Sequence, residues 1–431
     1  MPCRYNPRMA GKALARDVKL REVWAWSMYD FANSGYTTVV ITAVFSAYFV
    51  GGIAGKAPWA TFAWTAALSV SYAAVLLSAP LVGAWADAHA AKKPLLLAAT
   101  AGCVLFTAAL WFTAPGAVWL ALVLVALSNF FFATGENLIA AFLPELADSK
   151  AMGRVSGWGW SFGYLGGIVS LAACLAYITW AQQQGQAAAQ FVPASMLITA
   201  ALFALAAAPT FMFLRERAVP QPARASPWTR VVDTLHHAAE FRDLRRFLFC
   251  ILFYQAGIQA VIALAAIYAQ QAMGFTTPQT ITLILVVNFT AAAGAFAFGY
   301  LQDRIGHVRA VALTLAGWIA MITIAYFAEG APAFWVAANM AGLCMGSSQA
   351  AGRAIVGYLS PPARLAEFFG LWGLAVKTAS IFGPLTYGAV TWIFAGNHRL
   401  AMLAVGAYFV VGLVLLAGID VERGRRAAVA G

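Results

Sequence analysis

The chain has 431 residues, of which 62% are hydrophobic and 10% are charged, and its formal net charge at pH 7 is +11. Soluble domains carry about 25% charged residues, so this composition excludes an ordinary soluble protein. Apolar runs of about 20 residues, the length that crosses a bilayer as a helix, recur between short polar breaks. A transmembrane β-barrel is excluded as well, because its strands alternate apolar and polar residues and these runs do not.

These runs predict an all-α polytopic membrane protein with twelve transmembrane helices. The predicted spans are residues 24–50, 62–84, 95–113, 118–142, 157–180, 193–214, 246–270, 279–301, 309–328, 332–358, 367–394 and 398–418.

Lysine and arginine gather on one side of this topology. Of the 27, 24 lie on or near one side: in the N-terminal tail, in or near the loops that follow even-numbered spans, in the middle segment or at the C-terminus. The other side holds only Lys56 and Arg399, and Lys377 lies within a span. The positive-inside rule then predicts that both termini are cytoplasmic. The positive charge is explained by orientation, so we predict no nucleic-acid partner.

A polar segment rich in arginine, proline and serine separates six spans from six. The predicted organisation is a cytoplasmic tail (1–23), an N-terminal six-helix bundle (24–214), a cytoplasmic linker (215–245), a C-terminal six-helix bundle (246–418) and a cytoplasmic tail (419–431).

The two bundles repeat a short motif. The chain reads GAWADAHAAKK after the second span and GYLQDRIGHVR after the eighth, so that Gly83 and Asp87 recur as Gly299 and Asp303 at an offset of 216 residues. Because six is an even number, the second copy enters the membrane in the same orientation as the first. This is a parallel repeat related by an axis along the membrane normal.

The repeated motif resembles the signature of the major facilitator superfamily between its second and third helices, G-x-L-a-D-r-x-G-r-k. The second copy matches it at Gly299, Leu301, Asp303, Arg304 and Gly306, whereas the first has Ala88 and Ala90 where arginine and glycine are usual. The resemblance implies two six-helix halves that rock against each other. It also implies that Asp87 and Asp303 cap or pair with neighbouring helix ends and stabilise one conformation.

Three longer stretches resemble a narrower branch of that superfamily. They are WSMYDFANSGYTTVVITAVFSAYF, LPELADSKAMGRVSGWGWSFGYLGG and FFGLWGLAVKTASIFGPLTYG. They are similar to the vacuolar amino-acid effluxer group and its bacterial members, also called the unknown major facilitator family. The resemblance implies a twelve-helix transporter, and the eukaryotic members are associated with amino-acid export from the vacuole. Short loops fit a bacterial member in the cytoplasmic (inner) membrane.

Polar residues inside the spans are the candidate site. In the first span Trp26, Asp30, Asn33 and Thr37 share one helical face. An ionisable residue inside a bilayer costs about 2.5 kcal/mol or more, so this face is expected to meet protein or water.

Helix geometry places Glu136 and Arg353 about as far from the cytoplasmic end of their spans as Asp30. The resemblance implies that the first, fourth, seventh and tenth helices line a central cavity, and the seventh adds Gln255 and Gln259. We hypothesise that Asp30, Glu136 and Arg353 form a cytoplasmic gate, in which two acids share one arginine and one carboxyl takes up a proton. The alternative is that these residues only reach toward the interface.

Lys377 lies near the middle of the eleventh span, where its ammonium reaches water poorly. We expect it to pair with a carboxylate across the cavity or to bind an anionic group of the substrate. A buried structural ion pair is the alternative.

Small residues predict close helix packing. Gly159, Gly163 and Gly167 repeat at four-residue spacing in the fifth span, and Ala291 and Ala295 do so in the eighth. The resemblance places these two helices where the halves meet, so we expect their packing there.

The predicted function is secondary active transport of a small solute, and the predicted substrate is a neutral amino acid that is exported. The predicted energy source is a proton gradient or the gradient of the solute itself. Export of organic anions or hydrophobic drugs is an alternative, and a non-transporting membrane receptor or scaffold is an alternative of another class. We predict no enzyme activity, because the G-x-S-x-G at Gly159 lies inside an apolar helix without a base. No cofactor or metal is predicted. The expected partners are the substrate and the lipid bilayer, and a monomer suffices.

Overall fold

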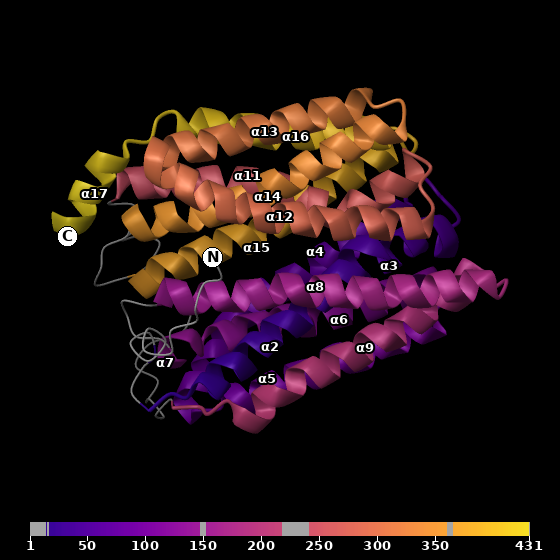
Figure 1. The fold of residues 1–431 in the computed structure, drawn as a ribbon, viewed down its shortest axis with the longest axis horizontal. Coiled ribbons are helices and arrows are strands. Elements are labelled where there is room, and N and C mark those ends of the chain that lie inside the picture. Colours follow the sequence, from indigo (N-terminus) through magenta and orange to yellow (C-terminus); the bar gives the residue numbers. More distant parts are fainter. Residues whose placement is uncertain (1–13, 15–16, 147–151, 218–240, 360–364, 431) are drawn as a thin grey trace, which may run out of the picture. The chain divides into compact units, whose positions relative to one another are not determined.

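The computed structural model describes residues 14, 17–146, 152–217, 241–359 and 365–430, and these are almost entirely helical (Figure 1). Up to residue 217 the helices are α2 (Leu20–Tyr36), α3 (Phe45–Tyr48), α4 (Ala60–His89), α5 (Lys92–Ala109), α6 (Val118–Ala140), α7 (Leu143–Leu146), α8 (Met152–Gln183) and α9 (Ala188–Phe213). From residue 241 they are α11 (Arg242–Gln271), α12 (Thr277–Ile305), α13 (His307–Phe327), α14 (Ala331–Leu359), α15 (Leu365–Ile393), α16 (His398–Leu416) and α17 (Val421–Ala430).

Ten helical segments among the described residues are long and apolar enough to cross a bilayer, and each coincides with a predicted span. The other two predicted spans, 332–358 and 367–394, coincide with α14 and α15, which are 29 residues long and are not among those ten. The prediction of an all-helical polytopic membrane protein is therefore confirmed.

The first span is not one regular helix. After α2 the backbone widens into a π-helical segment, Thr37–Ala43, and a second one, Phe49–Ile53, follows α3. The hydroxyl of Thr37 donates to the Asn33 carbonyl at 3.1 Å, and that of Thr38 donates to the Ser34 carbonyl at 2.7 Å. Such back-bonding from threonine bends helices, and π-helical turns occur frequently at functional sites.

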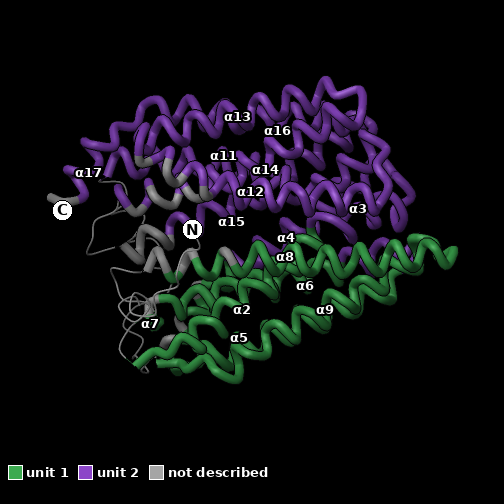
Figure 2. The backbone as a smooth tube through the Cα atoms, in the orientation of Figure 1, with its two compact units in different colours: residues 1–41, 77–113, 123–224 green, residues 42–76, 114–122, 225–431 purple. Residues whose placement is uncertain are grey.

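The described chain falls into two compact units (Figure 2). Unit 1 comprises residues 1–41, 77–113 and 123–224, and unit 2 comprises residues 42–76, 114–122 and 225–431. The divisions fall inside the first span, α4 and α6. The predicted bundle boundaries at residues 214 and 246 stay a prediction.

In unit 1, α8 packs on α2 through its glycines. A Cβ atom built on Gly163 would lie 2.9 Å from the Ser34 hydroxyl oxygen, and one built on Gly167 would lie 3.1 Å from a methyl of Thr38. Glycine therefore lets the two backbones approach closely. The close packing is confirmed, with α2 of the same unit as the partner, and the expected packing against the eighth span stays a prediction.

In unit 2, α12 packs on α14 in the same way. A Cβ atom on Gly346 would overlap the backbone of Ala291 and Ala295, the two small residues singled out in the eighth span. Elsewhere in the core the rings of Trp318 and Phe409 stack with their centroids 5.0 Å apart. The first of these contacts holds α14, the helix that contains Arg353, against α12.

Candidate functional site

Helices α2 and α6 of unit 1 run antiparallel, and two hydrogen bonds set their register. The indole nitrogen of Trp26 donates to the Ile139 carbonyl at 2.9 Å, and the hydroxyls of Tyr36 and Ser128 lie 2.8 Å apart. As the residue number rises along α2 it therefore falls along α6.

Between these bonds, Tyr29 of α2 lies against Gly135 of α6. A Cβ atom on that glycine would sit 2.5 Å from the tyrosine hydroxyl oxygen, so only glycine leaves room. Asp30 and Glu136 each follow one member of this contact, and both are half-buried. The structure thus places the two predicted acids at one level on neighbouring helices.

The face of α2 that carries Asp30 meets α8. A Cβ atom on Gly159 would overlap the Asp30 carboxylate and would lie 2.8 Å from the Trp26 ring, so Gly159 makes the space for both. Asn33, one turn further, is 6% exposed, and its Oδ1 accepts no hydrogen bond from the described residues. This face therefore lies against protein, as a polar face inside a bilayer must.

Unit 2 contains the same kind of contact between α11 and α14. A Cβ atom on Gly352 would overlap the Tyr254 hydroxyl. Gln255 follows the tyrosine and is 3% exposed, and Arg353 follows the glycine. The side chain of Arg353 lies outside the described residues, so the gate of Asp30, Glu136 and Arg353 stays a prediction.

Two buried oxygens of α11 are left without a partner among the described residues. They are the Tyr254 hydroxyl and the Gln255 Oε1. Gln259, one turn beyond Gln255 on the same face, is half-buried. Because buried polar groups are usually satisfied, an unsatisfied amide oxygen is a candidate ligand contact.

Lys377 belongs to a seam between α4 and α15, both represented in unit 2. Its ammonium lies 5.6 Å from the centroid of the Tyr72 ring, a cation–π distance. One turn along α15 the Ile381 carbonyl accepts a hydrogen bond from the Ser69 hydroxyl at 3.3 Å. Further on, a Cβ atom on Gly388 would overlap an α4 side chain. The seam is therefore polar around Lys377 and closely packed beyond it.

Sequence reasoning missed Tyr72 and the two tyrosine–glycine contacts. A signal for the contacts was present, because a tyrosine precedes both Asp30 and Gln255 and a glycine precedes both Glu136 and Arg353. For Tyr72 we find no such signal.

The repeated signature lies at helix ends. Gly83 is in the last turns of α4, and the backbone positions of Asp87, Gly299 and Asp303 are helical too, while the side chains of Asp87 and Asp303 lie outside the described residues. Arg304 is exposed. Their predicted conformational role stays a prediction.

Directly after each signature helix one residue has a positive φ. This residue is Ala90, at φ 49°, after α4 and Gly306, at φ 88° and ψ 158°, after α12. Both copies of the motif are thus followed by a residue with a positive φ, which glycine adopts more readily than other residues.

A charged network joins the segments at one end of unit 1. The Arg217 guanidinium lies 2.9 Å from a Glu22 carboxylate oxygen, and its backbone nitrogen donates to Glu145 at 2.6 Å. Lys92 in turn lies 2.7 Å from Glu145. The network ties the start of α2 to the starts of α5 and α7 and to the chain after α9.

Solved transporter structures share this fold. A variant of the nucleoside transporter NupG superposes with a TM-score of 0.71 at 16% identity, over 93% of this chain and 99% of that chain. The D-xylose-proton symporter gives a TM-score of 0.70 at 12% identity, over 94% and 98%. At such identities the likeness concerns the fold alone.

Sequence relatives are narrower. The chain is 29% identical over 412 residues to the uncharacterized MFS-type transporter YxiO of Bacillus subtilis, covering 92% of this chain and 94% of that protein. It is 26% identical over 333 residues to autophagy-related protein 22-1 of Aspergillus fumigatus, covering 69% of this chain and 53% of that protein. Residues 59–429 match the family described as vacuole effluxer Atg22 like. The chain therefore belongs to the Atg22-like vacuole effluxer family of major facilitator (MFS-type) membrane transporters.

Proposed function

We propose that this transporter exports neutral amino acids by alternating access, with Lys377 binding the substrate carboxylate. The observation that carries the proposal is the position of Lys377. It is the thirteenth residue of the 29-residue helix α15, about 18 Å from the helix start, and its ammonium faces Tyr72.

A lysine at this depth is costly unless a protein group, water or ligand stabilises its charge. The Tyr72 ring lies at cation–π distance and stabilises the ammonium by about 0.5–2 kcal/mol. A half-buried cation at this depth on the helix suits a substrate carboxylate, which would balance its charge. Membership of a vacuole effluxer family supports efflux, and the association of its eukaryotic members with amino acids supports the substrate class.

The amino group of a zwitterionic substrate needs an acceptor. Gln255 Oε1, in the same unit as Lys377, is a buried acceptor without a partner among the described residues and suits an ammonium. Asp30 and Glu136, level with each other in unit 1, are the acids that we propose as carriers of a coupled proton. We place both chain termini in the cytoplasm and the protein in the bacterial cytoplasmic membrane, as the distribution of lysine and arginine favours.

An organic anion is the second candidate substrate, because Lys377 would bind any carboxylate. It differs from an amino acid by lacking the ammonium for which Gln255 Oε1 is suited.

Solute counterflow in proteoliposomes tests the proposal. Vesicles that hold purified protein are loaded with one unlabelled solute, and entry of the labelled solute is followed for neutral amino acids and, separately, for organic anions. We expect counterflow for at least one neutral amino acid, its loss in Lys377→Met and its retention in Lys56→Met, which removes an exposed loop lysine. Counterflow of organic anions alone would overturn the substrate class, and an active Lys377→Met variant would overturn the role of the lysine.

A further inference from the structure

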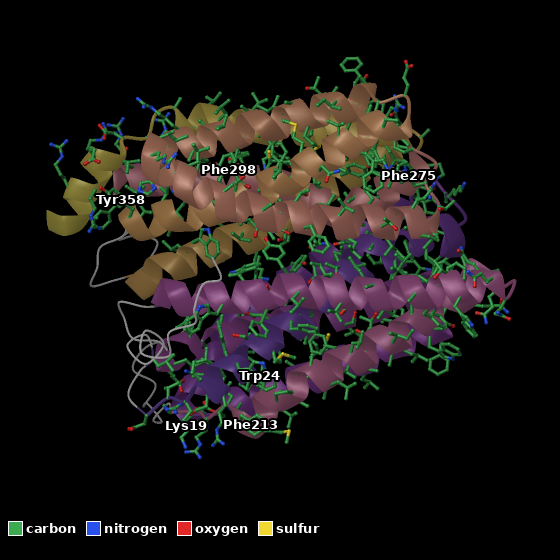
Figure 3. All side chains as sticks on the ribbon, viewed as in Figure 1. Lys19, Trp24, Phe213, Phe275, Phe298 and Tyr358 are labelled. Carbon is green, nitrogen blue, oxygen red and sulfur yellow. The ribbon has the colours of Figure 1, made fainter. Side chains whose placement is uncertain are left out.

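The last described helix, α17, packs on α11 and α14 of the same unit, at the end where α11 begins. Figure 3 shows Tyr358 beside α17, at the end of unit 2 opposite Phe275. The Arg425 guanidinium lies 5.2 Å from the Tyr358 ring centroid and donates to the Tyr358 carbonyl at 3.1 Å. Ala428 is 1% exposed, so α17 is held by burial as well as by charge.

A carboxylate–arginine pair forms the centre of this docking. Asp243, in the first turn of α11, is 4% exposed and accepts hydrogen bonds from Arg423 Nε at 2.8 Å and Arg423 Nη2 at 2.6 Å. The backbone nitrogen of Asp420 donates to the same carboxylate at 3.0 Å. The charge of Asp243 is thus neutralised, while Nη1 of Arg423 takes no part in either bond.

Beside this pair lies a cavity of about 220 Å³ between the start of α11 and α17. It is lined by Phe241, Arg242, Asp243, Leu244, Arg423, Gly424 and Ala427. The backbone nitrogens of the first helical turn have no acceptor within the helix, and the helix dipole adds positive potential there. Two arginines and the start of a long helix therefore surround one cavity, an arrangement that suits a phosphate.

The two segments that form the cavity carry more arginines than carboxylates, so they have a net positive charge. Residues 242–246 and 420–426 contain six arginines against three carboxylates. Arg242 and Arg426 are both exposed, and Arg242 alone of the two lines the cavity. An anion would complete this site.

The outer face of α11 shows at which depth the cavity lies. Arg242, Arg245 and Phe249 are exposed at i, i+3 and i+7, with Phe249 54% exposed. Phe249 lies about 10 Å further along the helix than Arg242. The span predicted to begin at residue 246 puts Phe249 in the acyl region, so Arg242 and Arg245, one to two turns before it, are expected at the level of the lipid phosphates.

We propose that the cavity between the first turn of α11 and α17 binds the phosphate of an anionic phospholipid, with Arg242 and Arg423 as its cationic groups. The lipid bridges the two helices and so holds α17 against the start of α11. This site is separate from the residues assigned to transport, and its test does not depend on the substrate.

Thermal unfolding of the full-length protein in an uncharged detergent provides the test. Phosphatidylglycerol is titrated against phosphatidylcholine with the same acyl chains. We expect phosphatidylglycerol to raise the unfolding temperature to a plateau, and Arg242→Gln to remove most of that rise. Arg426→Gln makes the same charge change on the same surface, outside the cavity, and should retain it.

A count of bound lipids by native mass spectrometry completes the test, with one retained phosphatidylglycerol expected for the wild type and none for Arg242→Gln. Arg242→Lys, which keeps the charge, shows by an intermediate rise that the variant folds. Three results would overturn the proposal: an equal rise with phosphatidylcholine, an equal rise with inorganic phosphate, which would indicate a small-anion site, or equal losses in Arg242→Gln and Arg426→Gln, which would indicate diffuse attraction to the membrane.

Discussion

The two tyrosine–glycine contacts both place a tyrosine hydroxyl against a glycine of a neighbouring helix, but the two hydroxyls differ in their hydrogen bonding. In unit 1 the Tyr29 hydroxyl lies 2.8 Å from the Thr100 hydroxyl, which itself donates to the Leu96 carbonyl, so Tyr29 is the donor to Thr100. In unit 2 the Tyr254 hydroxyl has no partner among the described residues. The contact itself is thus kept in both units, whereas the hydrogen bond is kept in one.

The residues that follow these contacts differ in charge. Unit 1 has the acids Asp30 and Glu136, whereas unit 2 has Gln255 and Arg353 at the matching positions. The difference teaches that a repeated packing contact can hold helices at one level while the neighbouring positions diverge toward different tasks. We assign proton uptake to the acids of unit 1 and substrate contact to the amide of unit 2.

Changing the acid of unit 1 should have the largest effect on this division of tasks. We expect Asp30→Asn to abolish accumulation driven by a pH gradient, because the amide cannot take up a proton, and to spare counterflow at equal pH. Gln255→Leu, at the matching position, should weaken counterflow and keep the response to pH. Uptake into proteoliposomes with and without a pH gradient measures accumulation and counterflow for each variant. The same defect in both variants would contradict the assignment of different tasks to the two residues.

The glycines come next. A Cβ atom at Gly135 or Gly352 overlaps a tyrosine hydroxyl, so each Gly→Ala variant should lose about 1–3 kcal/mol of stability. Adding Tyr254→Phe to Gly352→Ala should restore stability fully, whereas Tyr29→Phe should rescue Gly135→Ala only in part, because it also removes a hydrogen bond. Unfolding temperatures in detergent measure these differences. If neither Tyr→Phe substitution restores stability to its Gly→Ala variant, the tyrosine hydroxyl is not the group that the added methyl meets.

The tyrosines alone should show a smaller difference. Tyr29→Phe is expected to cost about 1 kcal/mol, since the hydrogen bond to Thr100 is lost. Tyr254→Phe should be neutral or stabilising, because it removes a buried hydroxyl without a partner among the described residues. Thr100→Val leaves Tyr29 in the situation of Tyr254, and its cost should not add to that of Tyr29→Phe. Full additivity in that double variant would contradict the assigned bond.

The smallest effect concerns the residues that end the signature helices. Gly306→Ala should cost about 1–2 kcal/mol, because alanine is disfavoured in the left-handed region. Ala90→Gly should gain less than about 1 kcal/mol, because glycine loses more chain entropy on folding. Chemical unfolding of both variants measures this, and a stabilised Gly306→Ala protein would show that the two turns are not equivalent.

Much of the fold follows from the sequence because apolar runs of membrane length have few alternatives. The offset that pairs Asp87 with Asp303 also pairs Ala90 with Gly306, the two residues with a positive φ, so the repeat can be recognised from the sequence alone. Periodicity likewise gave the shared face of Trp26, Asp30 and Asn33. Each of these is a local pattern, which one sequence displays directly.

Contacts between distant segments did not follow. Tyr72 and Lys377 lie on different helices far apart in the chain, and nothing in either segment specifies the other. The glycines of α8 indicated close packing without naming α2 as the partner. The π-helical segment after Tyr36 depends on where the Thr37 and Thr38 hydroxyls donate, which composition does not fix.

Competition in counterflow tests most directly the claim that Lys377 binds the substrate carboxylate. A transported amino acid is competed by its own unlabelled form or by its amide, which keeps the ammonium and lacks the carboxylate. We predict that in the wild type the amino acid competes and the amide does not. An amide that competes as well as the amino acid in the wild type would contradict it.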